Sequence, residues 1–323
     1  MVAISMSASA VARIRFAESA LWEVAASVRV LRRPDHHAIH APWVTRVRPA
    51  LADAGLLDPE TCLLWRLIPS EPGYLPDFLT PTPPGLTVDL DAELAVLRST
   101  PASAVREQIA LLAGLPAAAL RADPPAGLRR LTAEIEAYWR IALAPDWPRI
   151  HTLLDAEVAT RTRQLAESGA AGLLNGLHER VSWTDGTLSI DKRACLANDV
   201  ADGRGLVLVP SVFVWPSVLS ISAGEWPQLA YPAAAIGTLW ETPERASPSL
   251  VGVLGRGRAQ LLVEMHTPTS TGELARRTGI TAGGVSQHLT ALRAAGLVTT
   301  QRNGRAVLNR RTAIADALLA GAQ

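Results

Sequence analysis

The chain has 323 residues, enough for two or three domains, and 48% of them are apolar, which is ample for sizeable hydrophobic cores. The chain has only two cysteines, which argues against a disulfide framework, and no run of 18 apolar residues that could span a membrane. Charged residues close to the start argue against a secretory signal. We therefore expect a soluble cytoplasmic protein. The formal charge of +1 conceals an asymmetry, because residues 245–323 hold ten arginines and three acidic residues, whereas residues 1–244 carry −6. Such a basic segment is typical of nucleic-acid binding, which releases counterions from phosphates.

The first 178 residues are predicted to be mainly helical. Apolar residues recur at helical spacing between residues 21 and 31, and Arg32-Arg33-Pro34 ends the pattern. Residues 90–143 hold three more amphipathic segments separated by prolines, which favours a helical bundle. A longer helix is expected from Arg149 to about Ala166.

Histidines cluster in the segment DHHAIHAPW, residues 35–43. His36 and His40 are four residues apart, so both could lie on one helix face. A zinc site needs three or four ligands, and no further residue nearby completes one. A metal site and ordinary polar or capping histidines both remain open, and the second interpretation is preferred. No metal and no cofactor are therefore predicted.

The pattern changes to alternation over residues 179–240. Two short β-type runs flank Asp185-Gly186, a typical hairpin turn, and three further runs follow between residues 206 and 231. We expect a small antiparallel sheet. Trp183 and Trp215 could build a pocket between helices and sheet for a small apolar or aromatic effector, although ordinary packing is the alternative for both.

Residues 243–248, PERASP, are the predicted domain boundary, and two helices are expected at 250–254 and 256–265. The stretch GVLGRGRA superficially resembles a phosphate-binding loop but follows no convincing strand. It is interpreted as a tight helix–helix connection whose Arg256 and Arg258 face DNA phosphates. Familiar catalytic patterns such as G-x-S-x-G and H-E-x-x-H do not occur, so no catalytic residues and no enzymatic activity are predicted.

Residues 270–295 have the pattern of a helix-turn-helix. Ser270 and Glu273 have the spacing of a capping box, which begins a first short helix. Ile280 can anchor the turn in the core, and Thr281 can cap a second helix. That second helix has an apolar stripe that should face the core, formed by Val285, Leu289 and Leu292.

A β-hairpin is expected behind the second helix. Two β-type runs, 297–301 and 305–309, are joined through Asn303-Gly304, a strong turn signal because both positions tolerate positive φ. A helix-turn-helix followed by a hairpin is a winged helix, and a final helix is expected at 314–319.

The polar face of the second helix and the hairpin tip are the candidate DNA contacts. Gln287 can form two hydrogen bonds with an adenine, and Ser286 can bond a base or a phosphate. Arg302 and Arg305 flank the hairpin tip, where guanidinium groups suit phosphates or the minor groove. The complete predicted DNA-binding set is Thr281, Ala282, Gly283, Gly284, Ser286, Gln287, Thr290, Arg293, Arg302, Asn303 and Arg305.

The segments ELARRTGI, GGVSQHLTALRAAGLV and RNGRAVL resemble the winged helix of ArsR-type transcriptional regulators over about residues 245–320. The whole chain also resembles poorly characterised actinobacterial ArsR-like regulators with a long amino-terminal domain, through RFAESALWEVAASVRVL, GYLPDFLTPTPPG and LVLVPSVFVWP. The resemblance implies that residues 281–290 enter the major groove, that 302–305 form the wing, and that a homodimer represses by occluding promoters. The family's metal-sensing positions lack cysteines here and offer only Asp316, so metal sensing at them is not expected.

The predicted fold is therefore mainly α with small antiparallel β elements, an α+β protein. Residues 1–244 should form a dimerisation or effector domain, helical over 1–178 and β-rich over 179–240, and residues 245–323 a winged helix-turn-helix. The predicted function is a sequence-specific regulator that binds double-stranded DNA as a homodimer. A small-molecule-responsive regulator and a protein-interaction adaptor with an inert winged helix remain as alternatives.

Overall fold

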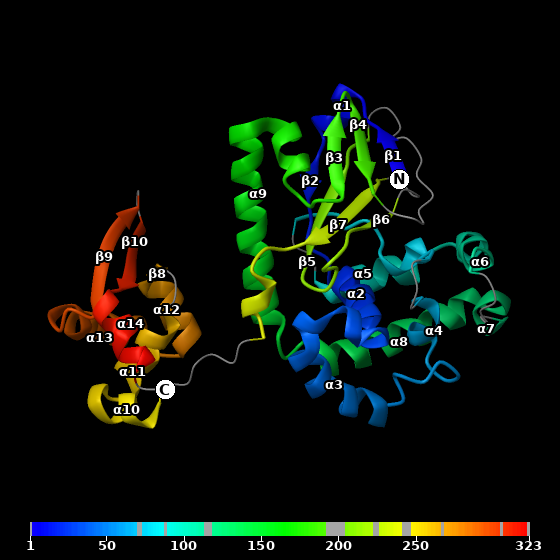
Figure 1. Cartoon of the computed structure of the whole chain (residues 1–323). Coiled ribbons are helices and arrows are strands. Elements are labelled where there is room, and N and C mark those ends of the chain that lie inside the picture. The colour runs from blue at the N-terminus through cyan, green and yellow to red at the C-terminus, as the bar shows by residue number, and fades with distance from the viewer. Residues whose placement is uncertain are drawn as a thin grey trace. The chain divides into compact units, whose positions relative to one another are not determined.

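The computed structural model describes residues 2–69, 73–86, 89–112, 118–191, 204–221, 226–240, 247–265, 268–303 and 306–321 (Figure 1). The chain divides into two compact units, Met1–Trp240 and Glu241–Gln323. Among the described helices, none is long and apolar enough to span a membrane.

The larger unit is built mainly from helices. Their bounds are α1 Ala8–Val11, α2 Ala20–Arg32, α3 Ala41–Asp53, α4 Leu63–Leu67, α5 Leu90–Arg98, α6 Ala102–Ala110, α7 Ala118–Ala122, α8 Pro124–Ala142 and α9 Trp147–Asn175, with short 3₁₀ turns at Pro34–His36, Ala38–His40, Asp77–Leu79 and Ile236–Thr238. Residues 90–142 hold four helices, one more than expected. The last of the long helices, α9, is interrupted at Gly169, whose φ of 66° is not helical, close to where the sequence predicts a helix end.

Strands of the larger unit form two sheets. The first is antiparallel, in the order β1-β4-β3, with β1 Val2–Ser5, β3 Val181–Thr184 and β4 Thr187–Ile190. Its hairpin turns at Asp185-Gly186, as predicted, and both residues have positive φ. The second sheet has the order β2-β5-β7-β6, with β2 Arg15–Phe16, β5 Val207–Ser211, β6 Leu219–Ile221 and β7 Gln228–Pro232.

The prediction of a single antiparallel sheet was wrong for this second sheet. Strand β5 pairs in parallel with β2 and with β7, and only β6 is antiparallel to its neighbour. Parallel strands are usually covered on both faces. All five residues of β5 are buried, a pattern that fits parallel pairing.

The mixed sheet separates two hydrophobic cores. Val207 and Val209 of β5 face a large core that surrounds α2, whereas Leu206 and Leu208 face a smaller core beside the first sheet. Helix α9 packs against β3 and β5 (Figure 1). Helix α2 contacts α3, α5, α8 and β5 and is buried along almost all of its length.

The smaller unit is a winged helix, which confirms the predicted α+β class and its carboxy-terminal module. It contains α10 Pro248–Leu254, α11 Arg256–Glu264, α12 Thr271–Thr278, α13 Ala282–Ala294 and α14 Ala313–Ala320, with β8 Thr269–Ser270, β9 Val298–Asn303 and β10 Ala306–Arg311 in the antiparallel order β8-β10-β9. The predicted stripe Val285, Leu289 and Leu292 is fully buried in its core. Strand β8 was not predicted, because two residues give no readable alternation.

Candidate nucleic-acid interface

Helix α12 begins and ends as its sequence predicts. The hydroxyl of Ser270 accepts a hydrogen bond from the backbone N–H of Glu273 at 3.2 Å, and Gly279 ends the helix with a φ of 70°. The Glu273 carboxylate accepts hydrogen bonds from Arg276 and Arg277. Partial burial opposes the effect, but these two guanidinium groups hold the pKa of Glu273 below its ordinary value. Both arginines are thus partly neutralised on their own helix.

The turn fixes the start of α13. Ile280 packs against the core, and the hydroxyl of Thr281 caps the helix by accepting from the N–H of Gly284 at 3.2 Å. A Cβ added to Gly284 would lie 3.0 Å from Cγ2 of Ile280, whereas a Cβ on Gly283 would meet nothing within 4 Å. Gly284 is therefore tightly packed against the turn, whereas Gly283 leaves the outer surface of the helix open.

Helix α13 presents a polar outer face. Ser286, Gln287 and Thr290 are exposed on the side opposite the buried stripe. The Thr290 hydroxyl donates to the carbonyl oxygen of Ser286 at 2.9 Å, and Arg293 donates to Leu289 and Thr290 on its own helix. Within the described part of the chain, the side chains of Ser286 and Gln287 have no hydrogen-bond partner, so both can bind an external ligand.

The Gly-rich stretch of residues 252–259 connects α10 to α11, as interpreted from the sequence. Gly255, with a φ of 79°, lies between α10 and α11. A Cβ on Gly257 would lie 2.8 Å from Nε2 of His288, so α11 approaches α13 closely at this glycine. Arg256 and Arg258 are exposed, and their contact with phosphates stays a prediction.

The hairpin pairs in a different register from the one that a two-residue turn at Asn303-Gly304 predicts. Asn303 pairs with Ala306, so its backbone belongs to β9 and not to the turn. Gly304 and Arg305 lie outside the described residues, as do the side chains of Arg302 and Asn303. The predicted contacts of these wing residues with DNA remain predictions.

Two segments of the chain match known families. Residues 261–306, from α11 into β10, match the MarR family, and residues 114–237 match a family of unknown function, DUF5937. No curated protein and no solved structure matches the chain. The carboxy-terminal unit is thus a winged helix-turn-helix of the kind found in DNA-binding transcriptional regulators. Its polar α13 face is where such a module would meet DNA.

The histidines singled out in the sequence have different partners. His36 contacts Arg33 at the surface, whereas His40 is buried and its Nδ1 accepts from Nε1 of Trp240 at 2.9 Å. Burial lowers the pKa of His40 to about 3, so its ring is neutral. Of the two interpretations left open, the structure favours ordinary polar histidines over a shared metal site.

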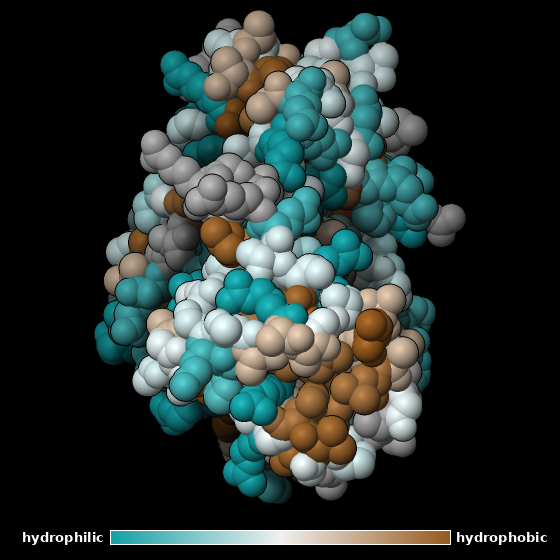
Figure 2. All heavy atoms as spheres, turned by 90° about the vertical axis from the view of Figure 1, so that its left-hand side faces the viewer, coloured by the Kyte–Doolittle hydropathy of each residue, from teal (hydrophilic) through white to brown (hydrophobic). Residues whose placement is uncertain are grey.

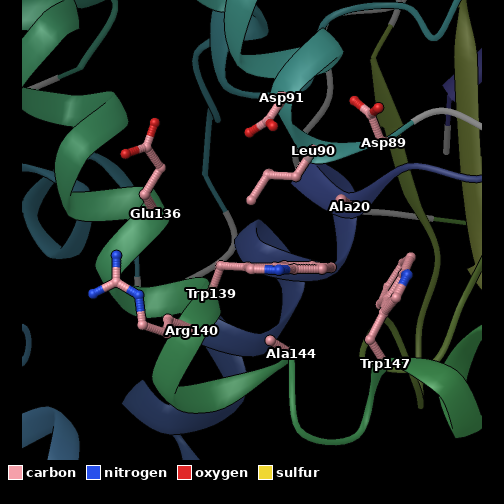
Figure 3. A pocket seen from close by; sticks show the side chains of 9 residues that line it. All are labelled: Ala20, Asp89, Leu90, Asp91, Glu136, Trp139, Arg140, Ala144 and Trp147. Atoms are coloured by element: carbon pink, nitrogen blue, oxygen red, sulfur yellow. The ribbon is translucent and has the colours of Figure 1, made fainter.

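The pocket proposed between Trp183 and Trp215 is not formed among the described residues, because the two indoles pack against different cores. A surface pocket of about 540 Å³ lies instead where α8, α9 and the start of α5 meet, and Trp139 and Trp147 line it (Figure 3). The centroids of these two indole ring systems are 4.7 Å apart. The other lining residues are Ala20, Asp89, Leu90, Asp91, Glu136, Arg140 and Ala144.

Proposed function

We propose that this protein is a sequence-specific transcriptional regulator of the ArsR type that binds double-stranded DNA as a homodimer and represses by occluding promoters. One observation carries the proposal: within a winged helix, α13 holds Ser286 and Gln287 exposed and without a partner in the described chain, opposite its buried stripe. Solvent-exposed amide and hydroxyl groups on a recognition helix suit the donor and acceptor pattern of the major groove.

The other residues of the set would position the helix. Gly283 lets the backbone approach the duplex, and Thr281, whose hydroxyl caps α13, lies at the end of the helix where N–H groups favour a phosphate. The arginines predicted at the wing, Arg302 and Arg305, would contact phosphates or the minor groove. Gln287 would then supply the direct reading of an adenine.

Homodimerisation is supported by an apolar surface on the same unit. Val253 of α10 is 77% exposed and Ile314 of α14 is 65% exposed. Figure 2 shows a continuous apolar area on the lower part of the face turned towards the viewer. A second copy would remove these side chains from water. Two recognition helices about one helical turn of DNA apart would also give the specificity that one helix lacks.

An electrophoretic mobility-shift experiment tests the proposal with the purified full chain and the DNA upstream of its own gene. We expect the protein to retard this DNA, and an unlabelled DNA of the same composition in shuffled order should not abolish the retardation. Failure to retard any intergenic DNA from that neighbourhood would instead favour the protein-interaction adaptor.

A second candidate function, a regulator that responds to a small molecule, is supported by the pocket in Figure 3. Two indoles offer flat apolar surfaces, and Asp89, Asp91 and Glu136 surround them with negative charge that Arg140 only partly offsets. This lining favours an aromatic or apolar molecule that carries a positive charge. Thermal-shift screening with aromatic amines would test it, with Trp139→Ala as the variant that should lose the response.

A further inference from the structure

A buried carboxylate, a histidine and a second carboxylate meet at a place in the larger unit that plays no part in the proposed DNA contacts. Glu18 lies between β2 and α2, whereas His151 and Asp155 are one turn apart on α9. One ligand atom from each residue lies within 4.8 Å of the other two. Nε2 of His151 is 3.6 Å from Oε2 of Glu18, and Nδ1 is 3.0 Å from Oδ2 of Asp155.

The side chain of Glu18 is 2% exposed, and neither of its carboxylate oxygens has a hydrogen-bond partner. A buried carboxylate without a partner is costly, because nothing replaces the water it has lost. Glu18 lies beside His151 and Asp155, and a cation bound among the three would offset the negative charge of the two carboxylates.

We propose that Glu18, His151 and Asp155 bind a divalent transition-metal ion such as zinc. One imidazole nitrogen and two carboxylate oxygens are ligands that zinc accepts, with metal–ligand bonds of about 2.0–2.2 Å. Tetrahedral bonds of that length place ligand atoms roughly 3.4 Å apart. One ligand atom from each of the three residues lies within 4.8 Å of the others, so the three must draw together around an ion. The side chains of His151 and Asp155 are 32% and 58% exposed, which leaves them room to move.

The imidazole makes the site more suitable for a transition metal than for magnesium or calcium, which prefer oxygen ligands alone. Glu18 supplies the buried end of the site, and the two α9 residues supply its solvent-facing end, through which an ion and one or more waters can enter. Only one nitrogen of His151 can ligate the ion. Asp155 is the third protein ligand of the proposed site, and water can complete the tetrahedral coordination.

Metal binding would join the junction of β2 and α2 to α9, segments more than a hundred residues apart in the sequence. An ion that binds only the folded chain stabilises it, so zinc should raise the thermal midpoint of unfolding. Metal binding is independent of the proposed DNA contacts, so failure of one proposal leaves the other standing.

The test uses the metal-free full chain, isothermal titration with zinc chloride and metal analysis after dialysis. We expect one zinc ion per chain, little competition from millimolar magnesium, and a visible absorption band when cobalt replaces zinc. His151→Gln and Asp155→Asn should each weaken zinc binding by at least about tenfold, the usual cost of losing a ligand or its supporting partner. His36→Gln is the matched control and should bind zinc like the natural chain.

Two results would overturn the proposal. One is a full chain that binds no zinc at micromolar concentration, and the other is a His151→Gln variant, folded by circular dichroism, that binds zinc as tightly as the natural chain. If that variant does not fold, Asp155→Asn decides, because the Asp155 side chain is mostly exposed. Zinc bound elsewhere, for example at His36, would survive both substitutions and would equally contradict the assignment.

Discussion

A Cβ added to Gly205 would lie 2.1 Å from the carbonyl oxygen of Arg13. The two residues are far apart in the sequence and meet where β2 enters its parallel pairing with β5, next to the hydrogen bond from the N–H of Arg15 to the carbonyl of Leu206 at 3.0 Å. The close approach of these two backbones requires a residue without a side chain.

Gly205→Ala should therefore destabilise the larger unit, because the obstacle is backbone and cannot rotate away. We expect a loss of about 1–3 kcal/mol or more in the free energy of unfolding, as for overpacked cores. Urea unfolding followed by circular dichroism measures it. Gly85→Ala is the control, since a Cβ there meets nothing within 4 Å. An equal stability of the two variants would contradict the close approach.

The two glycines of α13 should respond differently to alanine. Gly283→Ala has open space and should leave the fold intact, or stabilise the helix by up to about 1 kcal/mol. It should nevertheless weaken DNA binding if the backbone approaches the duplex here. Gly284→Ala should instead gain less stability or lose some, because Ile280 and Thr281 must move. Thermal unfolding and mobility shift, measured on both variants, separate packing from DNA contact.

Gln287→Ala should cost about 1–3 kcal/mol of binding on the preferred DNA site and relax one base position. The side chain is exposed, so the variant should fold normally. Competition with a set of single-base variants of the site measures the change. A uniform loss on all sequences would show that Gln287 does not read a base.

Arg305→Ala should weaken binding to every sequence, because a phosphate contact carries no base information. The slope of log affinity against log salt should fall by about one. Fluorescence anisotropy at several salt concentrations measures it. An unchanged slope would remove Arg305 from the phosphate contacts.

The apolar surface of α10 and α14 should hold two copies together. Val253→Glu and Ile314→Glu place a charge where a dimer would bury it, so each should shift the chain towards monomer in light scattering. Both side chains are exposed within the chain, so each variant should keep its fold. Val96→Glu, on the exposed side of α5, is the control. If Val253→Glu and Ile314→Glu both kept the molar mass of the natural chain, as the control should, these side chains would not form the dimer contact.

Glu23 should make the larger unit less stable as pH rises. Burial raises the pKa of Glu23 to about 7, although Val212, Ser211 and Phe213 donate hydrogen bonds to it. The folded state then holds a proton that the unfolded state loses near its ordinary pKa. The protonated Glu23 carboxyl therefore contributes its full share to the free energy of unfolding below about pH 4.5. That contribution, at most about 3 kcal/mol, is lost as the pH rises through 7. Glu23→Gln should flatten this part of the stability profile, and an unchanged profile would rule the carboxyl out.

The winged helix could be predicted closely because its signals are local. Ser270 and Thr281 cap α12 and α13 through contacts three residues away, and the buried stripe on α13 has helical spacing. The hairpin was found with its register displaced at Asn303, since strand ends depend on the partner strand as well as on the turn. The exposure of Gln287 follows from the same spacing.

By itself, the sequence determined where most helices and strands form, which residues of α13 face the core, and where the basic charge gathers. Tertiary structure alone decided the parallel pairing of β2 with β5, the pocket at Trp139 and Trp147, and the meeting of Glu18 with His151. Periodicity reports which side of an element is apolar but not which distant segment covers it. That choice depends on how all the apolar surfaces of the chain can be buried at once.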